Sequence, residues 1–191
     1  MSTRGARDSA RPALRTEVWS QRRSTALEDL VVALFDEYRD RLLRYQLSLG
    51  VTVADGEEII QEAFLALFRH LQLGRSRTNL RGWLFRVVHN LALKRRADNQ
   101  RRGEPLADFA AEEETVRDHA PDPEEQASHG QTQRRLQAVY RALPDADRRC
   151  LALRAEGLRY REIAAVLDMS LGAVSISLAR SLARFARAAE R

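Results

Sequence analysis

The sequence predicts an all-α protein of two small helical domains joined by an acidic flexible linker. Three observations support this fold class. Apolar residues recur with the three-to-four-residue spacing of amphipathic helices, and no useful length of chain alternates with period two as a half-buried strand would. Residues 103–130 hold nine acids and three of the five prolines, a composition typical of a solvated linker. The 191 residues are enough for two domains of about 100 residues or fewer.

The first domain is predicted over residues 25–102, after a basic tail at 1–24 whose polar, unpatterned sequence is typical of disorder. Its first helix is expected from Ala26 to Ser48. Thr25, followed three residues later by Glu28, forms a capping-box pattern at its start.

Two further helices complete a three-helix bundle. One is expected over residues 56–71 with Asp55 as its N-cap, and the other over residues 80–96 with Asn79 as its N-cap. The core-facing stripe of the second helix is Ile59, Ile60, Ala63, Phe64, Leu67, Phe68 and Leu71, and that of the third is Leu80, Trp83, Leu84, Val87, Val88 and Leu91.

The second domain is predicted over residues 131–191, after the linker at 103–130. Helices are expected over 146–155, 160–167 and 171–188, with Gly157 as the C-cap of the first. The residues expected to be buried on the last helix are Leu171, Val174, Leu178, Leu182 and Phe185.

Several classes of protein are excluded by what the sequence lacks. No apolar run approaches the roughly 18 residues of a membrane span, and the N-terminus has no signal-peptide core, so a cytoplasmic protein is expected. The single cysteine, Cys150, and the four histidines show no metal-ligand spacing, so neither a metal nor another cofactor is predicted. Phosphate-loop, nucleophile-elbow and zinc-protease motifs are also missing, so the chain is not expected to be an enzyme.

The charge distribution favours a nucleic-acid-binding protein. Residues 75–103 carry a net charge of +8 and residues 131–191 carry +6, while residues 104–130 between them carry −8. Two basic blocks joined by an acidic tether indicate two nucleic-acid contacts. Arginine supplies nearly all of the positive charge, which suits phosphate binding but is also the bias of a GC-rich genome.

The last two helices have the spacing of a helix-turn-helix motif, with the three-residue turn Asp168-Met169-Ser170 and with Ser170 able to cap the second helix. In that motif the second helix enters the major groove. A plain helical hairpin with a solvated polar face is the alternative. The polar face offers Gly172, Ala173, Ser175, Ser177, Arg180 and Arg184.

The first domain has two further charged faces. On the third helix, Arg86, Asn90 and Lys94 follow one another at i+4 spacing and could track phosphates while an amide meets a base edge. A solvated helix end rich in cations is the alternative. On the second helix, the outer face suits a basic protein partner better than DNA, or is simply a soluble face. That face consists of Glu58, Gln61, Glu62 and Leu65.

Two blocks of sequence resemble bacterial RNA polymerase sigma factors. ADGEEIIQEAFLALFRHL followed by LRGWLFRVVHNLALKRR resembles their region 2, and LPDADRRCLALRAEGLRYREIAAVLDMSLGAVSISLARSLARF resembles their region 4. With only these two regions and a short linker, the chain resembles the extracytoplasmic function (ECF) subfamily. This family implies a non-enzymatic initiation factor that binds core RNA polymerase and directs it to promoters.

The resemblance assigns roles to particular residues. It implies that the second helix docks on the β′ clamp of the polymerase, that the third helix captures the melted −10 element, and that the helix-turn-helix reads the duplex −35 element while its domain sits on the β-flap. The linker would then lie in the RNA exit path. Trp83 falls on the core stripe, so packing is expected for it. An anti-sigma factor is a further candidate partner. The polymerase-binding set is Glu57, Glu58, Ile59, Gln61, Glu62 and Leu65; the −10 set is Arg81, Arg86, His89, Asn90, Lys94, Arg95 and Arg96; the −35 set is Arg161, Ser170, Gly172, Ala173, Ser175, Ser177, Arg180 and Arg184.

The chain departs from the family pattern at three places: the turn of the helix-turn-helix, the third helix of the first domain, and the recognition helix, which is the helix expected over residues 171–188. Asp168 replaces a usual glycine, Lys94 replaces a usual acid, and the family's Thr-Val-Lys-Ser-Arg-Leu reads Ala-Val-Ser-Ile-Ser-Leu over residues 173–178. Two usual cations are therefore missing. A free-standing helix-turn-helix regulator that binds DNA as a dimer is the alternative function, although the sequence shows no apolar stripe for a dimer interface.

Overall fold

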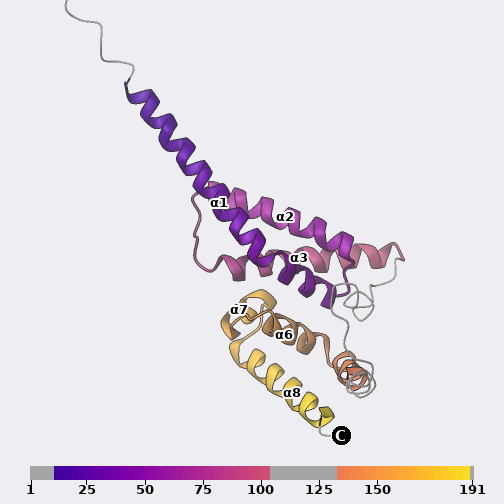
Figure 1. Ribbon diagram of the computed structural model, residues 1–191. Coiled ribbons are helices and arrows are strands. Elements are labelled where there is room, and N and C mark those ends of the chain that lie inside the picture. Colours follow the sequence, from indigo (N-terminus) through magenta and orange to yellow (C-terminus); the bar gives the residue numbers. More distant parts are fainter. Residues whose placement is uncertain (1–10, 104–132, 190–191) are drawn as a thin grey trace, which may run out of the picture.

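The computed structural model describes residues 11–103 and 133–189, with side chains from residue 25 onward (Figure 1). Every regular element in these ranges is a helix, which confirms the all-α prediction. Apart from Gly103, the predicted linker lies outside the described residues. In chain order the elements are α1 (Arg11–Ser48), α2 (Val53–Gln72), α3 (Leu80–Arg101), a helical segment over 133–141, α6 (Asp145–Ala155), α7 (Tyr160–Leu167) and α8 (Leu171–Ala189).

Helix α1 begins earlier than the sequence predicted. The prediction of disorder over residues 1–24 is wrong from Arg11 onward, and Thr25 lies inside the helix instead of capping it. Pro12 falls in the first helical turn, where its missing N–H costs no hydrogen bond. Because no glycine or proline follows until Gly50, nothing in this stretch interrupts a helix. Figure 1 shows the first part of α1 extending beyond the other helices.

Helix α2 is capped by Thr52, whose hydroxyl accepts a hydrogen bond from the Asp55 backbone N–H at 3.2 Å. The prediction of Asp55 as N-cap is therefore wrong. Asp55 lies in the first turn, where its negative charge interacts favourably with the helix dipole. There its carboxylate accepts hydrogen bonds from Arg95 and, at 2.8 Å, from Asn99 of α3.

Helix α3 begins as predicted, because the Asn79 side chain accepts a hydrogen bond from the Gly82 backbone N–H at 3.1 Å. It runs to Arg101, five residues beyond its expected end. The packing role predicted for Trp83 is confirmed, since its ring lies 5.0 Å from that of His70 and packs against the core.

The buried face of α3 is rotated from the predicted stripe. Leu84 and Val88 are buried as expected, but Phe85, His89 and Ala92 are buried as well, while Val87 and Leu91 are only partly buried. Helix α3 packs against α1 and α2 of its own domain and also against α7 of the second domain. The contact with α7 covers a side of α3 that the three-helix bundle alone would leave exposed.

The core of the first domain joins α1, α2 and α3. Gly56 lets α1 and α2 approach closely, since a Cβ at this position would lie 2.8 Å from Leu43 Cδ1. The largest fully buried apolar side chains are Leu42, Tyr45, Ile59, Ile60, Leu67, Leu84 and Phe85.

The helices of the second domain match the predicted ranges within one residue. Gly157 has φ +78° directly after the C-cap of α6, a conformation that glycine adopts without strain. Helices α7 and α8 meet at 107°. In the turn between them, Asp168 has φ 54°, so an aspartate takes the left-handed conformation in which the family commonly has glycine.

The buried face of α8 also differs from the prediction. Val174 and Leu178 are buried as expected, but Leu171 and Leu182 are exposed. Two serines, Ser177 and Ser181, are buried in their place. Because α8 packs against α6 and α7, small hydroxyl side chains on this face allow close approach, and Ser177 finds a hydrogen-bond partner on α6.

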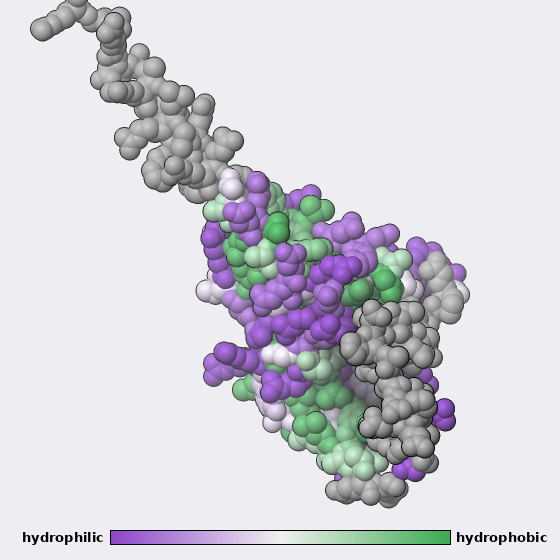
Figure 2. Space-filling view, viewed as in Figure 1, coloured by the Kyte–Doolittle hydropathy of each residue, from purple (hydrophilic) through white to green (hydrophobic). Residues whose placement is uncertain are grey.

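The two domains pack against each other, with α3 in contact with α7 and α1 in contact with α6. Figure 1 shows α6 and α7 below α1 and α3, and Figure 2 shows a hydrophilic band across this junction. Among the described helices, none is long and apolar enough to cross a membrane alone, and the pair α7 and α8 passes that test by length and composition only, with the 107° bend between them.

Candidate nucleic-acid interface

The acidic face of α2 is narrower than the sequence predicted. Ile59 is buried in the core, so it cannot contact a partner directly, and its place in the polymerase-binding set is corrected. Glu57 pairs with Arg39 of α1, and Glu58 pairs with Arg95 of α3 at 3.0 Å. Gln61, Glu62 and Leu65 are exposed, and Glu62 forms no ion pair with any described residue. Glu58 is paired, but its side chain is still 66% exposed.

The ridge predicted on α3 is exposed. Arg86, Asn90 and Lys94 all lie on the open surface of the helix. Their i+4 spacing places them on one face, one turn apart. The structure therefore brings together one amide and two cations, the combination that the prediction of a DNA contact requires.

His89 does not belong to this ridge. It is buried, and its Nδ1 lies 2.7 Å from the Tyr45 hydroxyl. Burial, assisted by the positive charge of Arg149, lowers the pKa of His89 to about 4, so the ring is neutral at pH 7. The prediction of His89 as a −10 residue is therefore corrected, and its role in the structure is to satisfy a buried tyrosine.

Three arginines of the predicted −10 set already have partners within the protein. Arg95 binds Asp55 and Glu58 of α2, and Arg96 donates to the Leu49 carbonyl at 3.1 Å. Arg81 binds the carboxylate of Glu162, with Nε donating to Oε1 at 3.3 Å. Because Glu162 belongs to α7, the last of these pairs joins the two domains.

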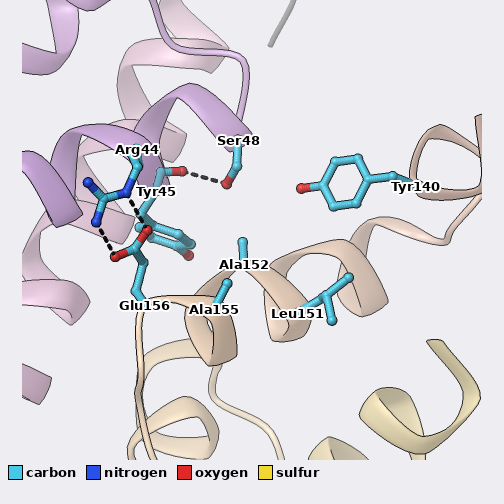
Figure 3. Close-up of a pocket in the computed structure, with 8 residues that line it drawn as sticks. All are labelled: Arg44, Tyr45, Ser48, Tyr140, Leu151, Ala152, Ala155 and Glu156. Atoms are coloured by element: carbon cyan, nitrogen blue, oxygen red, sulfur yellow. Dashed lines mark hydrogen bonds and ion pairs between the residues drawn. The ribbon is translucent and has the colours of Figure 1, made fainter. Parts of the chain in front are cut away.

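A second ion-pair cluster also joins the two domains. The buried Glu156 carboxylate accepts two hydrogen bonds of 3.1 Å from Arg44 of α1 (Figure 3). It also lies 3.5 Å from Arg41 of the same helix. A cavity of about 350 Å³ lies beside this cluster, between α1, the helical segment over 133–141 and α6. Its lining residues are Arg44, Tyr45, Ser48, Tyr140, Leu151, Ala152, Ala155 and Glu156. Sequence reasoning missed Glu156, because its partners lie more than 100 residues away in the other domain and no spacing pattern links them.

The helix-turn-helix has the local geometry that the sequence predicted. Ser170 caps α8, since its hydroxyl accepts a hydrogen bond from the Ala173 backbone N–H at 3.1 Å. At the start of α7, Glu162 accepts a hydrogen bond of 2.7 Å from the Arg159 backbone N–H. Glu162 therefore stabilises the N-terminus of α7 and binds the other domain at the same time.

Two residues of the predicted −35 set bind Asp147 of their own domain, Ser177 from a buried position and Arg180 with its side chain still 51% exposed. Ser177 is 2% exposed and donates to Asp147 Oδ1 at 2.8 Å. Arg180 donates from Nε and Nη2 to the two oxygens of the same carboxylate, at 2.9 and 2.7 Å. Arg180 is the main cause that holds the pKa of Asp147 below its usual range, so the carboxylate stays ionised. The prediction of Ser177 as a DNA-contacting residue is corrected by its burial.

The remaining −35 residues are accessible, with Arg161, Ser170, Gly172 and Ser175 exposed and Ala173 and Arg184 partly exposed. Sequence reasoning passed over Ile176, which is 65% exposed on the same face of α8. The only sequence signal for Ile176 was a large apolar residue on the otherwise polar face of the helix.

Comparison with known proteins gives two matches along this chain. Residues 34–102 match the family described as Sigma-70 region 2, and residues 133–185 match Sigma-70, region 4. The curated relatives include the ECF RNA polymerase sigma factor SigE of Mycolicibacterium smegmatis, 33% identical over 74% of this chain and 54% of its own length. They also include the ECF RNA polymerase sigma-E factor of Haemophilus influenzae, 28% identical over 66% of this chain and 70% of that protein.

A similar fold occurs in the structure of CnrH in complex with the cytosolic domain of CnrY, with a TM-score of 0.56, 21% identity, and coverage of 89% of this chain and 94% of that one. The chain spans about half, or less, of the length of the first curated relatives it matches. Region 2 precedes region 4 along the chain, and the two matches include all of α2, α3, α6 and α7 and parts of α1 and α8. The chain therefore belongs to the ECF group of RNA polymerase sigma factors.

Proposed function

We propose that this chain is a non-enzymatic initiation factor that binds core RNA polymerase in the cytoplasm and directs it to specific promoters. In this proposal the first domain melts and reads the −10 element and the second domain reads the −35 element. The observation that carries it is the presence, in one chain, of a capped helix-turn-helix and a separate exposed ridge of Arg86, Asn90 and Lys94. A protein with a single duplex contact would need only the first of these.

The proposed polymerase contact is the open part of the α2 face, Gln61, Glu62 and Leu65. This face combines an acid that lacks an internal partner among the described residues with a leucine that is 59% exposed. An acidic surface around an exposed apolar side chain suits a basic protein surface, here the β′ clamp. The second domain is proposed to sit on the β-flap.

The two domains have to separate before both promoter elements can be read. Elements centred near positions −10 and −35 lie about 25 base pairs apart, or roughly 85 Å along B-form DNA. In the structure α7 contacts α3 directly, and Arg81 of the proposed −10 set is bound to Glu162. The described arrangement is therefore proposed to be a closed resting form. CnrH was solved with the cytosolic domain of CnrY, and an anti-sigma protein that stabilises the closed form is a proposed partner of this chain.

The test is transcription in vitro with purified core polymerase and a library of genomic promoter fragments. The proposal expects a defined set of start sites that requires both the chain and the core enzyme. The same fragments are then offered to the chain alone. Tight, sequence-specific binding without polymerase, together with no new start sites when the core enzyme is added, would establish the free-standing regulator instead.

A further inference from the structure

The exposed N-terminal half of α8 has no cation. Gly172 and Ser175 lie on its open surface, and Ile176 is 65% exposed between them and Ala179, which is also exposed. Ile176 and Ala179 are three residues apart and so lie on the same side of the helix. In the view of Figure 2, the lower part of the molecule, where Figure 1 places α8, has a largely hydrophobic surface.

The nearby arginine is engaged elsewhere. A guanidinium reads guanine by directing two N–H groups at O6 and N7 together. Arg180 uses its Nε and Nη2 groups in this paired manner on the Asp147 carboxylate, which is 1% exposed. Since Asp147 also holds Ser177 Oγ at 2.8 Å, the carboxylate fixes Arg180 and Ser177 to α6. The N-terminal half of α8 therefore offers neither an arginine nor the Ser177 hydroxyl to a base edge, and the first arginine after it, Arg180, is paired with Asp147.

Exposed arginines lie on both sides of this uncharged part of α8. Arg159 and Arg161 are exposed at the start of α7, and Arg187 is exposed near the end of α8. Arginines on both sides of a neutral centre fit a duplex, in which phosphates flank the base edges of the groove. A protein partner would not require cations at both ends of an apolar strip.

We propose that Ile176 is a specificity-determining residue that reads the 5-methyl group of thymine in the −35 element. The thymine methyl is the one apolar group on the base edges of the major groove, and aliphatic side chains contact it there. Ser175, one residue before, supplies a hydroxyl able to bond to either kind of base pair. This inference rests on the proposed function, because it requires the helix-turn-helix to enter promoter DNA.

The probe is a single methyl group, removed by replacing thymine with uracil. Holoenzyme is assembled from the full chain and core polymerase, and a −35 region is selected from a randomised library upstream of a fixed −10 element. Each thymine of the selected element is then replaced by uracil, one position at a time, and promoter binding is measured. Burying one methyl group corresponds to roughly a three- to fivefold change in binding. We expect a loss of this size at one or two positions.

Ile176→Ser is the decisive variant, since it removes the apolar contact from an exposed site where the fold does not need it. It should bind the thymine and uracil promoters equally. Leu182→Ser is the matched control, because Leu182 is 58% exposed on the same helix but lies beyond its N-terminal half. It should retain the full thymine preference.

Two outcomes would overturn the inference while leaving the proposed function intact. Holoenzyme that initiates normally but is indifferent to uracil at every −35 position would assign the apolar face to a protein partner. An undiminished preference for thymine in the Ile176→Ser holoenzyme would assign the methyl contact to another residue. A complete absence of initiation on any library member is a different result, because it removes the proposed function and this inference with it.

Discussion

Arg81 of α3 and Glu162 of α7 form an ion pair between the two domains, although 80 residues separate them in sequence. Both side chains are mostly buried at the junction. Arg81 belongs to the proposed −10 surface, and Glu162 also accepts the backbone hydrogen bond that begins α7. In the closed form Arg81 is therefore bound to Glu162, whereas in the open form it is proposed to contact the −10 element.

Arg81→Glu should open the domains. The substitution places two carboxylates where an ion pair of about 1 kcal/mol stood, and leaves the hydrogen bond between Glu162 and the Arg159 backbone intact. Small-angle X-ray scattering should report a larger radius of gyration for the variant, with unchanged helix content by circular dichroism. Asp98→Asn is the control, because its pair with Arg101 lies within α3 and is exposed. Equal dimensions for wild type and Arg81→Glu would mean that apolar contacts alone hold the domains together.

Stability should fall between about pH 6.5 and pH 4 because of His89. Its pKa is near 4 in the folded protein and near 6.5 when unfolded, so in this range the unfolded state binds the extra proton. The contribution is fully present above pH 6.5, is lost as the pH falls, and amounts to roughly 3 kcal/mol in total. Urea unfolding at pH 7.5, 5.5 and 4.5 measures it.

His89→Gln should flatten this pH dependence, since glutamine can still accept from the Tyr45 hydroxyl and does not titrate. His70→Gln is the comparison, because His70 lies at the surface near the Ser76 carbonyl. The carboxylates with lowered pKa values, such as Asp147, contribute from about pH 5 downward, so the interval between pH 7.5 and 5.5 isolates the effect of His89. A slope between pH 7.5 and 5.5 that survives His89→Gln would contradict the assignment.

Glu62→Lys should weaken the binding of core polymerase by about tenfold or more, since it places a cation in the proposed acidic contact. Glu62 is a cleaner position than Glu58, whose reversal would also release Arg95 and so disturb the contact between α2 and α3. Asp36→Lys, an equally exposed charge reversal on α1, is the matched control. Fluorescence anisotropy with labelled protein gives both affinities. If both reversals weaken binding equally, general charge attraction and not this face is responsible.

Asn90→Ala should reduce open-complex formation about tenfold or more on duplex promoter, and by a similar factor on DNA whose −10 element is already single-stranded, because the proposed contact is to the melted strand. Asn90 is exposed, so its loss leaves the fold intact, and no neighbouring side chain offers a replacement amide. A bidentate amide contact is worth about 1–3 kcal/mol of base discrimination. Arg86→Ala, on the same ridge, should weaken binding evenly across sequences as loss of a phosphate contact does. Permanganate footprinting of the melted region compares the two, and normal melting by Asn90→Ala would contradict the assignment.

The existence and ends of most helices could be predicted because local signals decide them. Asn79 and Ser170 cap their helices through side chains three residues from the N–H they bind, and Gly157 ends α6 through its own φ. The start of α1 was missed because a polar stretch without a breaker has no local signal that separates helix from coil.

Which residues of a helix are buried was harder to predict than where the helix lies, because burial depends on the helices that pack against it. His89 looked like one more polar residue of a basic helix until Tyr45 was placed against it. Ser177 looked available for DNA until Asp147, 30 residues away, was found to bind it. Neither partner could be identified from spacing.

The ion pairs at the domain junction have a consequence for ionic strength. Promoter binding by a basic protein weakens as salt is added, because fewer counterions are released from DNA. Added salt also screens the pairs formed by Glu156 and Glu162 and so makes opening easier. The two effects have opposite signs, so promoter binding by this chain should depend less on salt than its number of phosphate contacts alone would require. If the closed form is the resting state, as proposed, a junction held by ion pairs would make promoter binding less sensitive to the ionic strength of the cell.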